Sequence, residues 1–493
     1  MRPSNPPVLL LTLATLLCAG AATAQDTQSK PLPPRLQEQS ERRAERAAER
    51  ERLAALDEAW KAGDFAQVET LLNHAWTTDR GWALRSSFSL ITSPDISVRP
   101  LGIAQLAAHA TPEELANALD TLDPARLRPE RRALAMLATP SLAKAPEEQF
   151  QPLIAALLRD QDRILRAAAA TAIAKRGDAS HLRALLPLLR ESPTQKPSWD
   201  GDEEDILQSR LYGAFEAISG IRPRNATEAG SVPLVPSPAS ETAPQEASDV
   251  SVQKIRGRTY YALRRFELCF EFGKGREGDV AMARAVDAFA SPASDRIASV
   301  GQPIFGPLTI ASPRLIIADR SRYSAVGGNS FRPGSGTGNE IALLESLPDA
   351  MAATVAHECV HVYHGASFEK QPRWLSEGLA ESLSISSERS IWNEGEVRRR
   401  NLDDDLDKGL FSTLIGWKGP ASSGDRENRL YAMGHLAVDY LRFGPHAAPE
   451  TRLHLLMARL AVSESDRSAL EKLYGASLRD LDRKAASWAR GMP

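Results

Sequence analysis

The chain contains 493 residues with a formal net charge of -3; 42% of its residues are hydrophobic and 25% are charged. At about 100–200 residues per domain, this length predicts roughly two to four domains of ordinary globular composition. The near-neutral charge provides no overall basic field, which argues against nucleic acid as a partner. Three cysteines in a chain of this length exclude a disulfide-stabilised scaffold.

The N-terminus has the pattern of a secretory signal peptide, which we predict for residues 1–24. An apolar stretch covers residues 8–22 and ends in an A-x-A element at residues 22–24. This stretch is shorter than the run of about 20 apolar residues that a membrane-spanning helix needs, and no other stretch approaches that length. We therefore expect an exported protein, periplasmic or extracellular, without an integral membrane span after cleavage. Cleavage leaves Cys269 and Cys359, which we expect to be free thiols rather than a disulfide.

A charged segment, residues 25–52, follows the predicted cleavage site. It combines prolines with neighbouring charges of both signs, which is typical of a linker that continues into an exposed helix. From Leu53 the pattern is helical. Gly63 followed by Asp64 is typical of one helix ending and the next being capped.

Residues 53–222 are expected to form an all-α domain, and residues 99–222 carry its clearest helical periodicity. An Ala-rich helix is predicted over residues 165–176, and a second apolar helix over residues 181–189. Looser echoes recur about every 30–45 residues, at 103–109, 134–140 and 215–220. Helix pairs at this period indicate an α-solenoid, and these segments resemble HEAT repeats. An irregular helical bundle is the alternative. In either case we expect this domain to bind a protein partner or to act as a spacer.

A segment without periodicity, residues 223–252, follows the helical domain. Its Pro, Ser, Ala, Glu and Thr residues cannot bury a core, so we expect a disordered linker. Beyond it, residues 253–493 are expected to form an α+β domain in which a small mixed sheet is followed by helices. Strand patterns occur over residues 266–272, 314–319 and 339–345. The glycine-rich segment 327–338 is expected to be a loop.

The motif that carries chemistry lies on a helix predicted from about Ser346 to His364. Within it, His357 and His361 are four residues apart, so their imidazoles project from one face with Cβ atoms about 5–6 Å apart. Both rings can then reach one metal ion at about 2.0–2.1 Å, the usual Zn–N distance. Glu358 lies about 100° around the helix from His357. It can therefore act as a general base beside the metal without being a ligand.

A second helix is predicted to start at Pro372, and it carries Glu377 within the sequence Trp-Leu-Ser-Glu-Gly-Leu-Ala-Glu. A short connection can bring Glu377 to the two histidines. Two His and one Glu leave the fourth zinc position open, as in hydrolytic sites. The metzincin pattern is not met, because His364 and Ser367 stand where it requires a glycine and a third histidine. His364 shares the histidine face, but a helix cannot easily bring three histidines over two turns to one tetrahedral ion.

The His-Glu-x-x-His pair followed by Trp-Leu-Ser-Glu-Gly-Leu-Ala-Glu resembles the gluzincin metallopeptidases, the thermolysin-like group with a glutamate as third ligand. It is most similar to bacterial MA-like peptidase domains. The resemblance spans roughly residues 253–493 and implies a gluzincin-type fold, one Zn²⁺ per chain, and a peptide or protein substrate. It implies that His357, His361 and Glu377 bind zinc and that Glu358 is the catalytic base.

The resemblance also implies supporting residues. Glu381 stands one turn beyond Glu377, where these enzymes place a carboxylate that orients a zinc-binding histidine. A plain solvent-exposed carboxylate is the alternative for Glu381. Tyr431 and His435, one turn apart on a later predicted helix, are the candidates for stabilising the oxyanion, with Tyr431 first. A packing role is the alternative for either residue.

These patterns predict an exported zinc metallopeptidase that hydrolyses peptide bonds through a metal-activated water, with Glu358 as general base. Strand 339–345, just before the metal-binding helix, is expected to be the sheet edge to which an extended peptide adds. The principal alternative is a HEAT-type interaction scaffold whose peptidase-like domain binds metal but is catalytically inactive. A zinc hydrolase that acts on a non-peptide bond is a third hypothesis.

Overall fold

The computed structural model describes residues 34–189, 203–231, 250–326, 334–387, 402–418 and 424–491, except positions 222, 224, 256, 257, 311, 338, 339 and 347. The predicted signal peptide therefore lies outside the described residues, as do residues 232–249 of the predicted linker. At the ends of that linker the structure differs from the expected disorder, because residues 226–231 form a helix and residues 251–252 begin a strand. The chain forms two compact units, Met1–Glu58 and Ala59–Pro493. Across the described ranges, no helix combines the length and apolar character that a membrane span requires.

Helix α1 (Pro34–Ala62) is exposed over most of its described side chains and carries both signs of charge, as the sequence predicts. It ends at Gly63, whose backbone has a left-handed φ of 71°. Asp64 then caps α2 (Phe65–Thr78) by accepting a hydrogen bond from the backbone N–H of Gln67 at 3.0 Å. The predicted helix boundary at Gly63 and Asp64 is thus confirmed.

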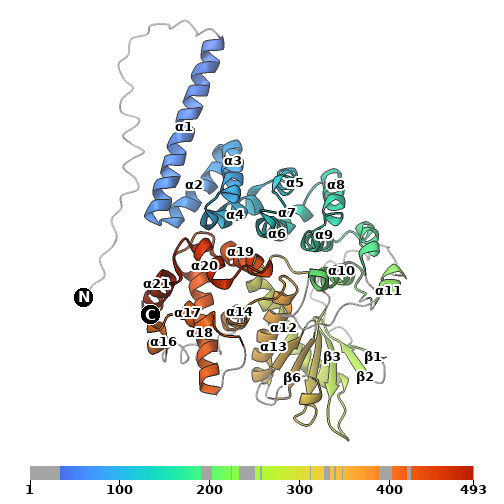
Figure 1. Ribbon diagram of the computed structural model, residues 1–493. Helices are drawn as coiled ribbons and strands as arrows, with labels where there is room; N and C mark the ends of the chain where they lie inside the picture. The colour runs from blue at the N-terminus through green and yellow to red at the C-terminus, as the bar shows by residue number, and fades with distance from the viewer. Residues whose placement is uncertain are drawn as a thin grey trace, which may run out of the picture. The chain divides into compact units, whose positions relative to one another are not determined.

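The helical region of the second unit continues from α2 through a series of packed helices (Figure 1). These are α3 (Arg80–Thr92), α4 (Arg99–His109), α5 (Pro112–Thr121), α6 (Arg128–Leu137), α7 (Thr139–Ala143), α8 (Glu147–Leu158), α9 (Arg163–Arg176) and α10 (Glu203–Ser219). Helix α9 confirms the Ala-rich prediction and ends at Gly177, which has a left-handed φ of 76°. Its buried alanines let α6, α7, α8 and α10 pack closely around it.

The predicted α-helix over residues 181–189 is wrong. The structure forms two short 3₁₀ segments there, η2 (Ala179–Ala184) and η3 (Leu186–Leu188). Pro187 explains the difference, because it has no N–H to donate to the carbonyl of Arg183 and its ring would clash with that carbonyl in an α-helix.

The α+β region contains a single mixed sheet with strand order β1-β2-β3-β4-β6-β5 (Figure 1). Its strands are β1 (Ser251–Ile255), β2 (Arg258–Ala262), β3 (Glu267–Glu271), β4 (Arg314–Ala318), β5 (Gly334–Thr337) and β6 (Glu340–Leu344). Strands β3, β4 and β6 are mutually parallel and confirm the three predicted strands. The hairpin of β1 and β2 was not predicted. Strand β5 lies in the glycine-rich segment for which a loop was expected.

The prediction that strand 339–345 forms the sheet edge is wrong. Strand β6 pairs with β4 on one side and with β5 on the other, so both of its hydrogen-bonding edges are used. The terminal strand on this side of the sheet is β5. The strand that ends a sheet depends on which distant segments pair, and the residues of one strand do not report this.

Among the remaining helices, α12 and α13 lie beside the sheet and the C-terminal helices lie beyond them (Figure 1). They are α11 (Ala226–Ser231), α12 (Val280–Phe305), α13 (Pro348–Gly365), α14 (Arg373–Ser387), α16 (Asp403–Asp407), α17 (Leu410–Leu414), α18 (Gly424–Phe443), α19 (Pro449–Ala461), α20 (Asp466–Tyr474) and α21 (Leu478–Arg490). Helix α13 packs against β5, β6, α12 and α14. A helical region followed by a small mixed sheet and further helices agrees with the predicted combination of an all-α and an α+β part.

Helices α14 and α18 approach each other closely at two glycines. A Cβ atom on Gly378 would lie 2.4 Å from the carbonyl oxygen of Gly434, closer than any real side chain tolerates. One turn before Gly378, the fully buried Trp374 donates from Nε1 to Asp466 at 2.9 Å. The glycine of the Ser-Glu-Gly-Leu sequence is therefore required by helix packing.

We expect Gly378→Ala to lower the free energy of unfolding by about 1–3 kcal/mol, because the added methyl group forces α14 and α18 apart. Gly230→Ala in α11 is the matched control, since a Cβ there meets nothing within 4 Å. That control should be neutral or stabilise by up to about 1 kcal/mol through helix propensity. Denaturant unfolding measures both variants. An unchanged midpoint for Gly378→Ala would contradict the packing constraint.

Candidate metal centre

Helices α13 and α14 bring the three predicted ligands together. His357 and His361 stand on successive turns of α13, and Glu377 lies near the start of α14. Their ligand atoms all lie within 4.8 Å of one another. The two Nε2 atoms of His357 and His361 are 3.3 Å apart. Oε2 of Glu377 lies 3.5 Å from Nε2 of His357 and 3.4 Å from Nε2 of His361.

These separations fit a tetrahedral zinc ion. Ligand atoms at about 2.0–2.1 Å from a tetrahedral centre must lie about 3.3–3.4 Å from one another. The three observed distances of 3.3, 3.4 and 3.5 Å match this edge length. Two imidazole nitrogens and one carboxylate oxygen are also a donor set that zinc prefers, and they leave one coordination position open.

The second ring nitrogen of each histidine has its own partner on α14. Nδ1 of His361 is 3.1 Å from Oγ of Ser376, a hydrogen bond buried in the protein. Nδ1 of His357 is 3.6 Å from Oε1 of Glu381. The structure thus places Glu381 beside His357, one of the two predicted ligand histidines. Sequence reasoning missed Ser376, although its place directly before Glu377 was a usable signal.

The second carboxylate oxygen of Glu377 faces a cation that sequence reasoning also missed. Nε of Arg373 lies 3.6 Å from Oε1 of Glu377, one helical turn earlier. Nη2 of Arg373 donates to Oε1 of Glu427 at 2.7 Å. The guanidinium carbon of Arg373 also lies over the ring of Trp417, 4.8 Å from its centroid. Glu377 therefore directs one oxygen to the histidines and the other to Arg373.

The local charges favour a cation between the three groups. Burial lowers the pKa of His357, but the hydrogen bond with Glu377 and the negative charges of Glu358 and Glu381 outweigh it and raise this pKa to about 9. Burial raises the pKa of Glu377, whereas its hydrogen bonds with His357 and His361 hold it well below the usual range. Without a bound metal, these interactions therefore favour the protonated form of His357. A metal ion would have to displace that proton.

The three donor side chains of the centre differ in how far they are exposed to solvent. The side chains of His361 and Glu377 are 4% and 10% exposed, whereas that of His357 is 20% exposed. Glu358, next to His357 on α13, is itself 7% exposed. A ligand from solvent would therefore reach the centre at His357, where Glu358 is the adjacent carboxylate.

Two other residues of α13 are directed into the core. Cys359 is fully buried, and burial raises the pKa of its thiol to about 12. His364 stacks on Phe305 with ring centroids 6.0 Å apart, and burial lowers its pKa to about 3. His364 is not part of the metal-capable group. Cys269 and Cys359 are both free thiols, which confirms that prediction.

The two candidates for oxyanion stabilisation have different surroundings on α18. The half-buried Tyr431 packs edge-on against Trp417 with centroids 5.3 Å apart, and it hydrogen-bonds Arg373 beside Glu377. His435 is 2% exposed, and its Nε2 lies 3.0 Å from Oδ2 of Asp439. Asp439 also accepts a hydrogen bond from Ser382 of α14 at 2.7 Å. His435 therefore takes part in the packing of α14 on α18, whereas Tyr431 is linked through Arg373 to Glu377.

A second group with metal-capable donors, Glu147, Asp178 and His181, lies in the helical region. Nη2 of Arg176 donates to Glu147 at 2.5 Å, and Gln151 donates to the same carboxylate at 2.7 Å. The negative charge that a cation would need is thus already compensated by Arg176. We assign no metal to this group.

Comparison of the chain with protein-family models, with curated proteins and with solved structures gave no significant match. The evidence for the function of this protein therefore comes from the residues of the centre and their geometry.

We expect zinc to raise the melting temperature of the protein, because an ion that binds only the folded state stabilises it by about 2.7 kcal/mol at 100 times its Kd. His361→Ala should abolish this shift and the binding of one zinc per chain. His74→Ala, an exposed histidine of α2, should retain both. Thermal unfolding with zinc and with a chelator, together with metal analysis, provides the measurement. An equal shift in His361→Ala would show that the site is misassigned.

We expect Ser376→Ala to weaken zinc binding about tenfold, because His361 would lose the hydrogen bond that fixes its ring. Ser384→Ala is the matched control on the same helix, because its hydroxyl donates to the backbone oxygen of Glu381 at 3.2 Å. Competition with a zinc-binding dye measures both affinities. Equal affinities in the two variants would remove Ser376 from the centre.

Proposed function

We propose that this protein is an exported zinc metallopeptidase with a gluzincin-type α+β region. The observation that carries the proposal is the set of distances among His357, His361 and Glu377, which equals the edge length of a tetrahedral zinc site. The residue next to His357 is a carboxylate, as hydrolysis requires. His357, His361 and Glu377 would hold one zinc ion per chain.

Bound zinc lowers the pKa of water and polarises a scissile carbonyl group. Glu358 takes the proton from the attacking water and delivers it to the leaving amine. Its position supports this role, because it directly follows His357 on α13 and its negative charge acts on the His357 imidazole. Its 7% exposure keeps bulk water from competing for that proton.

Tyr431 is the residue that we propose for stabilising the oxyanion of the transition state. Its hydroxyl is held by Arg373. Burial lowers the pKa of Arg373, but the contact with Tyr431 and the charges of Glu377 and Glu427 outweigh burial and raise this pKa. A hydroxyl fixed beside a metal ligand can donate where negative charge develops. His435, engaged by Asp439, is the second candidate.

The proposed substrate is an extended peptide or protein segment. Strand β5 ends the sheet and packs against α13, the helix that carries the histidine pair. A peptide that pairs with the outer edge of β5 would be held by main-chain hydrogen bonds beside the metal centre. Such binding fixes the direction of the chain without demanding particular side chains.

We expect Glu358→Gln to retain one zinc per chain and to lower peptide hydrolysis by about 10²–10⁴-fold, because the amide cannot accept the proton of water. Glu113→Gln, an exposed residue of α5, should keep full activity. A broad library of quenched fluorescent peptides measures cleavage, and metal analysis measures zinc.

The same variants, assayed on the peptide library and on ester substrates, separate the alternatives. Bound zinc without Glu358-dependent cleavage across the library would favour an inactive interaction scaffold. Glu358-dependent hydrolysis of esters or other acyl compounds, with none of peptides, would favour a zinc hydrolase of different substrate class.

A further inference from the structure

The three ligands stand on two helices joined by a short segment, residues 366–372, which we call the ligand connector. Helix α13 ends at Gly365 and α14 begins at Arg373. The conformation of the ligand connector therefore determines how the histidine pair is placed relative to Glu377. Shifts of about 0.5 Å matter at such a site, because ligand geometry must be held within that range.

Arg210 of α10 holds the start of the ligand connector. It is fully buried, and its three donor groups reach the carbonyl of Ala366, the hydroxyl of Ser367 and the carbonyl of Pro307, each at 3.0 Å. The Ser367 hydroxyl in turn donates to the carbonyl of Tyr363 in the last turn of α13 at 2.9 Å. Burial lowers the pKa of Arg210 to about 9, so the guanidinium stays charged near neutral pH.

Helix α10 is itself fixed against the α+β region. A Cβ atom on Gly213 would lie 2.5 Å from the carbonyl carbon of Ile310, so the helix touches that backbone directly. One turn later, Glu216 accepts a hydrogen bond from the backbone N–H of Ser312 at 2.9 Å. Arg210 thus extends from a rigid support.

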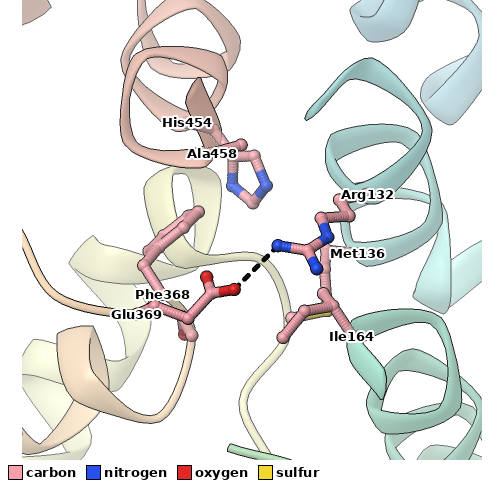
Figure 2. Close-up of a pocket in the computed structure, with 8 residues that line it drawn as sticks. Arg132, Met136, Ile164, Phe368, Glu369, His454 and Ala458 are labelled. Atoms are coloured by element: carbon pink, nitrogen blue, oxygen red, sulfur yellow. Dashed lines mark hydrogen bonds and ion pairs between the residues drawn. The ribbon is translucent and has the colours of Figure 1, made fainter. Parts of the chain in front are cut away.

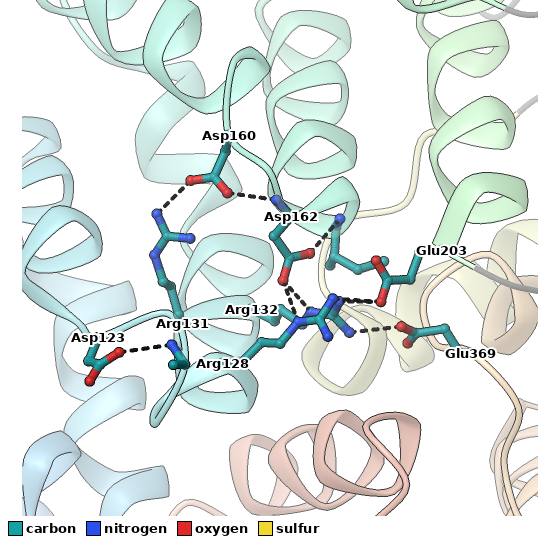
Figure 3. Close-up of polar contacts among 10 residues, drawn as sticks. Asp123, Arg128, Arg131, Arg132, Asp160, Asp162, Glu203 and Glu369 are labelled. Atoms are coloured by element: carbon teal, nitrogen blue, oxygen red, sulfur yellow. Dashed lines mark hydrogen bonds and ion pairs between the residues drawn. The ribbon is translucent and has the colours of Figure 1, made fainter.

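Arg132 of α6 holds the middle of the ligand connector. Its Nη1 donates to Oε1 of Glu369 at 2.8 Å, and its side chain is 3% exposed (Figure 2). Its other donors are occupied by Asp162 and Glu203, both at 2.7 Å, within the helical region (Figure 3). Three carboxylates therefore fix the guanidinium. Charge-assisted bonds of this kind are the strong ones in a protein interior.

Helix α19 covers the remaining side of the ligand connector. Nε2 of Gln371 donates to the carbonyl of Met457 at 3.1 Å and to that of Glu369 at 2.9 Å. Phe368 packs edge-on against His454 with ring centroids 4.8 Å apart, next to the small cavity that Arg132 also lines (Figure 2). The ligand connector is thus held by α6 and α10 from the helical region and by α19.

We propose that Arg210 and Arg132 are positioning residues of the metal centre, which act through the ligand connector. In this proposal the helical region helps to fix the geometry of the metal centre. This role is additional to those of a spacer or a partner-binding surface, which its sequence suggests. This inference depends on the proposed metal site, but it does not depend on whether the protein cleaves peptides.

The test compares zinc affinity in Arg210→Met and Glu369→Gln with that in wild-type protein. Each variant should weaken zinc binding at least about tenfold and alter the visible spectrum of the cobalt-substituted protein, because the ligand helices lose their fixed separation. Arg210→Lys should recover part of the affinity, since it restores the charge and one or two of the donors. Glu369→Gln is nearly isosteric and keeps the pairs of Arg132 with Asp162 and Glu203.

Arg131→Met is the matched control. Arg131 precedes Arg132 on α6, its side chain is 13% exposed, and it pairs at 2.6 Å with Asp160 inside the helical region (Figure 3). Its loss should lower the melting temperature but leave zinc affinity and the cobalt spectrum unchanged. Equal weakening in Arg131→Met would show that general destabilisation, not positioning, is responsible, and would overturn the proposal.

The remaining outcomes are also decisive. Wild-type affinity and cobalt spectra in both Arg210→Met and Glu369→Gln would overturn the positioning role and leave the peptidase proposal intact. If Arg210→Met fails to fold, Glu369→Gln carries the test alone. Zinc binding with the expected losses but without peptide cleavage would support the positioning role and contradict the peptidase proposal. Absence of zinc binding in wild-type protein would overturn both.

Discussion

The relative placement of α13 and α14 is the constraint on which the proposed metal centre depends. Neither helix can bind a tetrahedral ion alone, because the histidines come from one and the glutamate from the other. Helix α13 is fixed to α12 where the hydroxyls of Tyr363 and Ser294 meet at 2.5 Å. Helix α14 is fixed to α18 through the contact of Gly378 with Gly434. Apolar packing tolerates sliding more readily than directional bonds do, so these close contacts and polar links limit movement of the ligands.

The helical region and the α+β region are joined by buried charged contacts at the ligand connector and also at a second place. Glu130 of α6 is fully buried and accepts from Arg99 at 2.8 Å and from Arg459 of α19 at 2.9 Å. Breaking such a pair by removing one partner is costly, because the other charge stays buried without compensation. The two regions should therefore separate only when the whole unit unfolds. This agrees with the single compact unit from Ala59 onward.

Local sequence predicted the parts of this site that depend on a single helix. The spacing of His357 and His361 follows from helical periodicity, and the ends of α13 and α9 follow from proline and glycine signals. Features that depend on pairing between distant segments were missed, such as strand β5 and the place of β6 inside the sheet. The role of Arg210 was missed for the same reason. The sequence does not indicate that α10 contacts a segment 156 residues away. Pro187 was a local signal that should have excluded the helix predicted around it.

The position of Cys359, between the proposed base and the second histidine, has a consequence for oxidation chemistry. Only a thiolate reacts readily with peroxides or disulfides, and a thiol with a pKa of about 12 provides almost none at neutral pH. The side chain is also fully buried, so oxidants have no direct access to it. Cys359 therefore places a thiol between the two histidines without making this part of the helix sensitive to thiol oxidation.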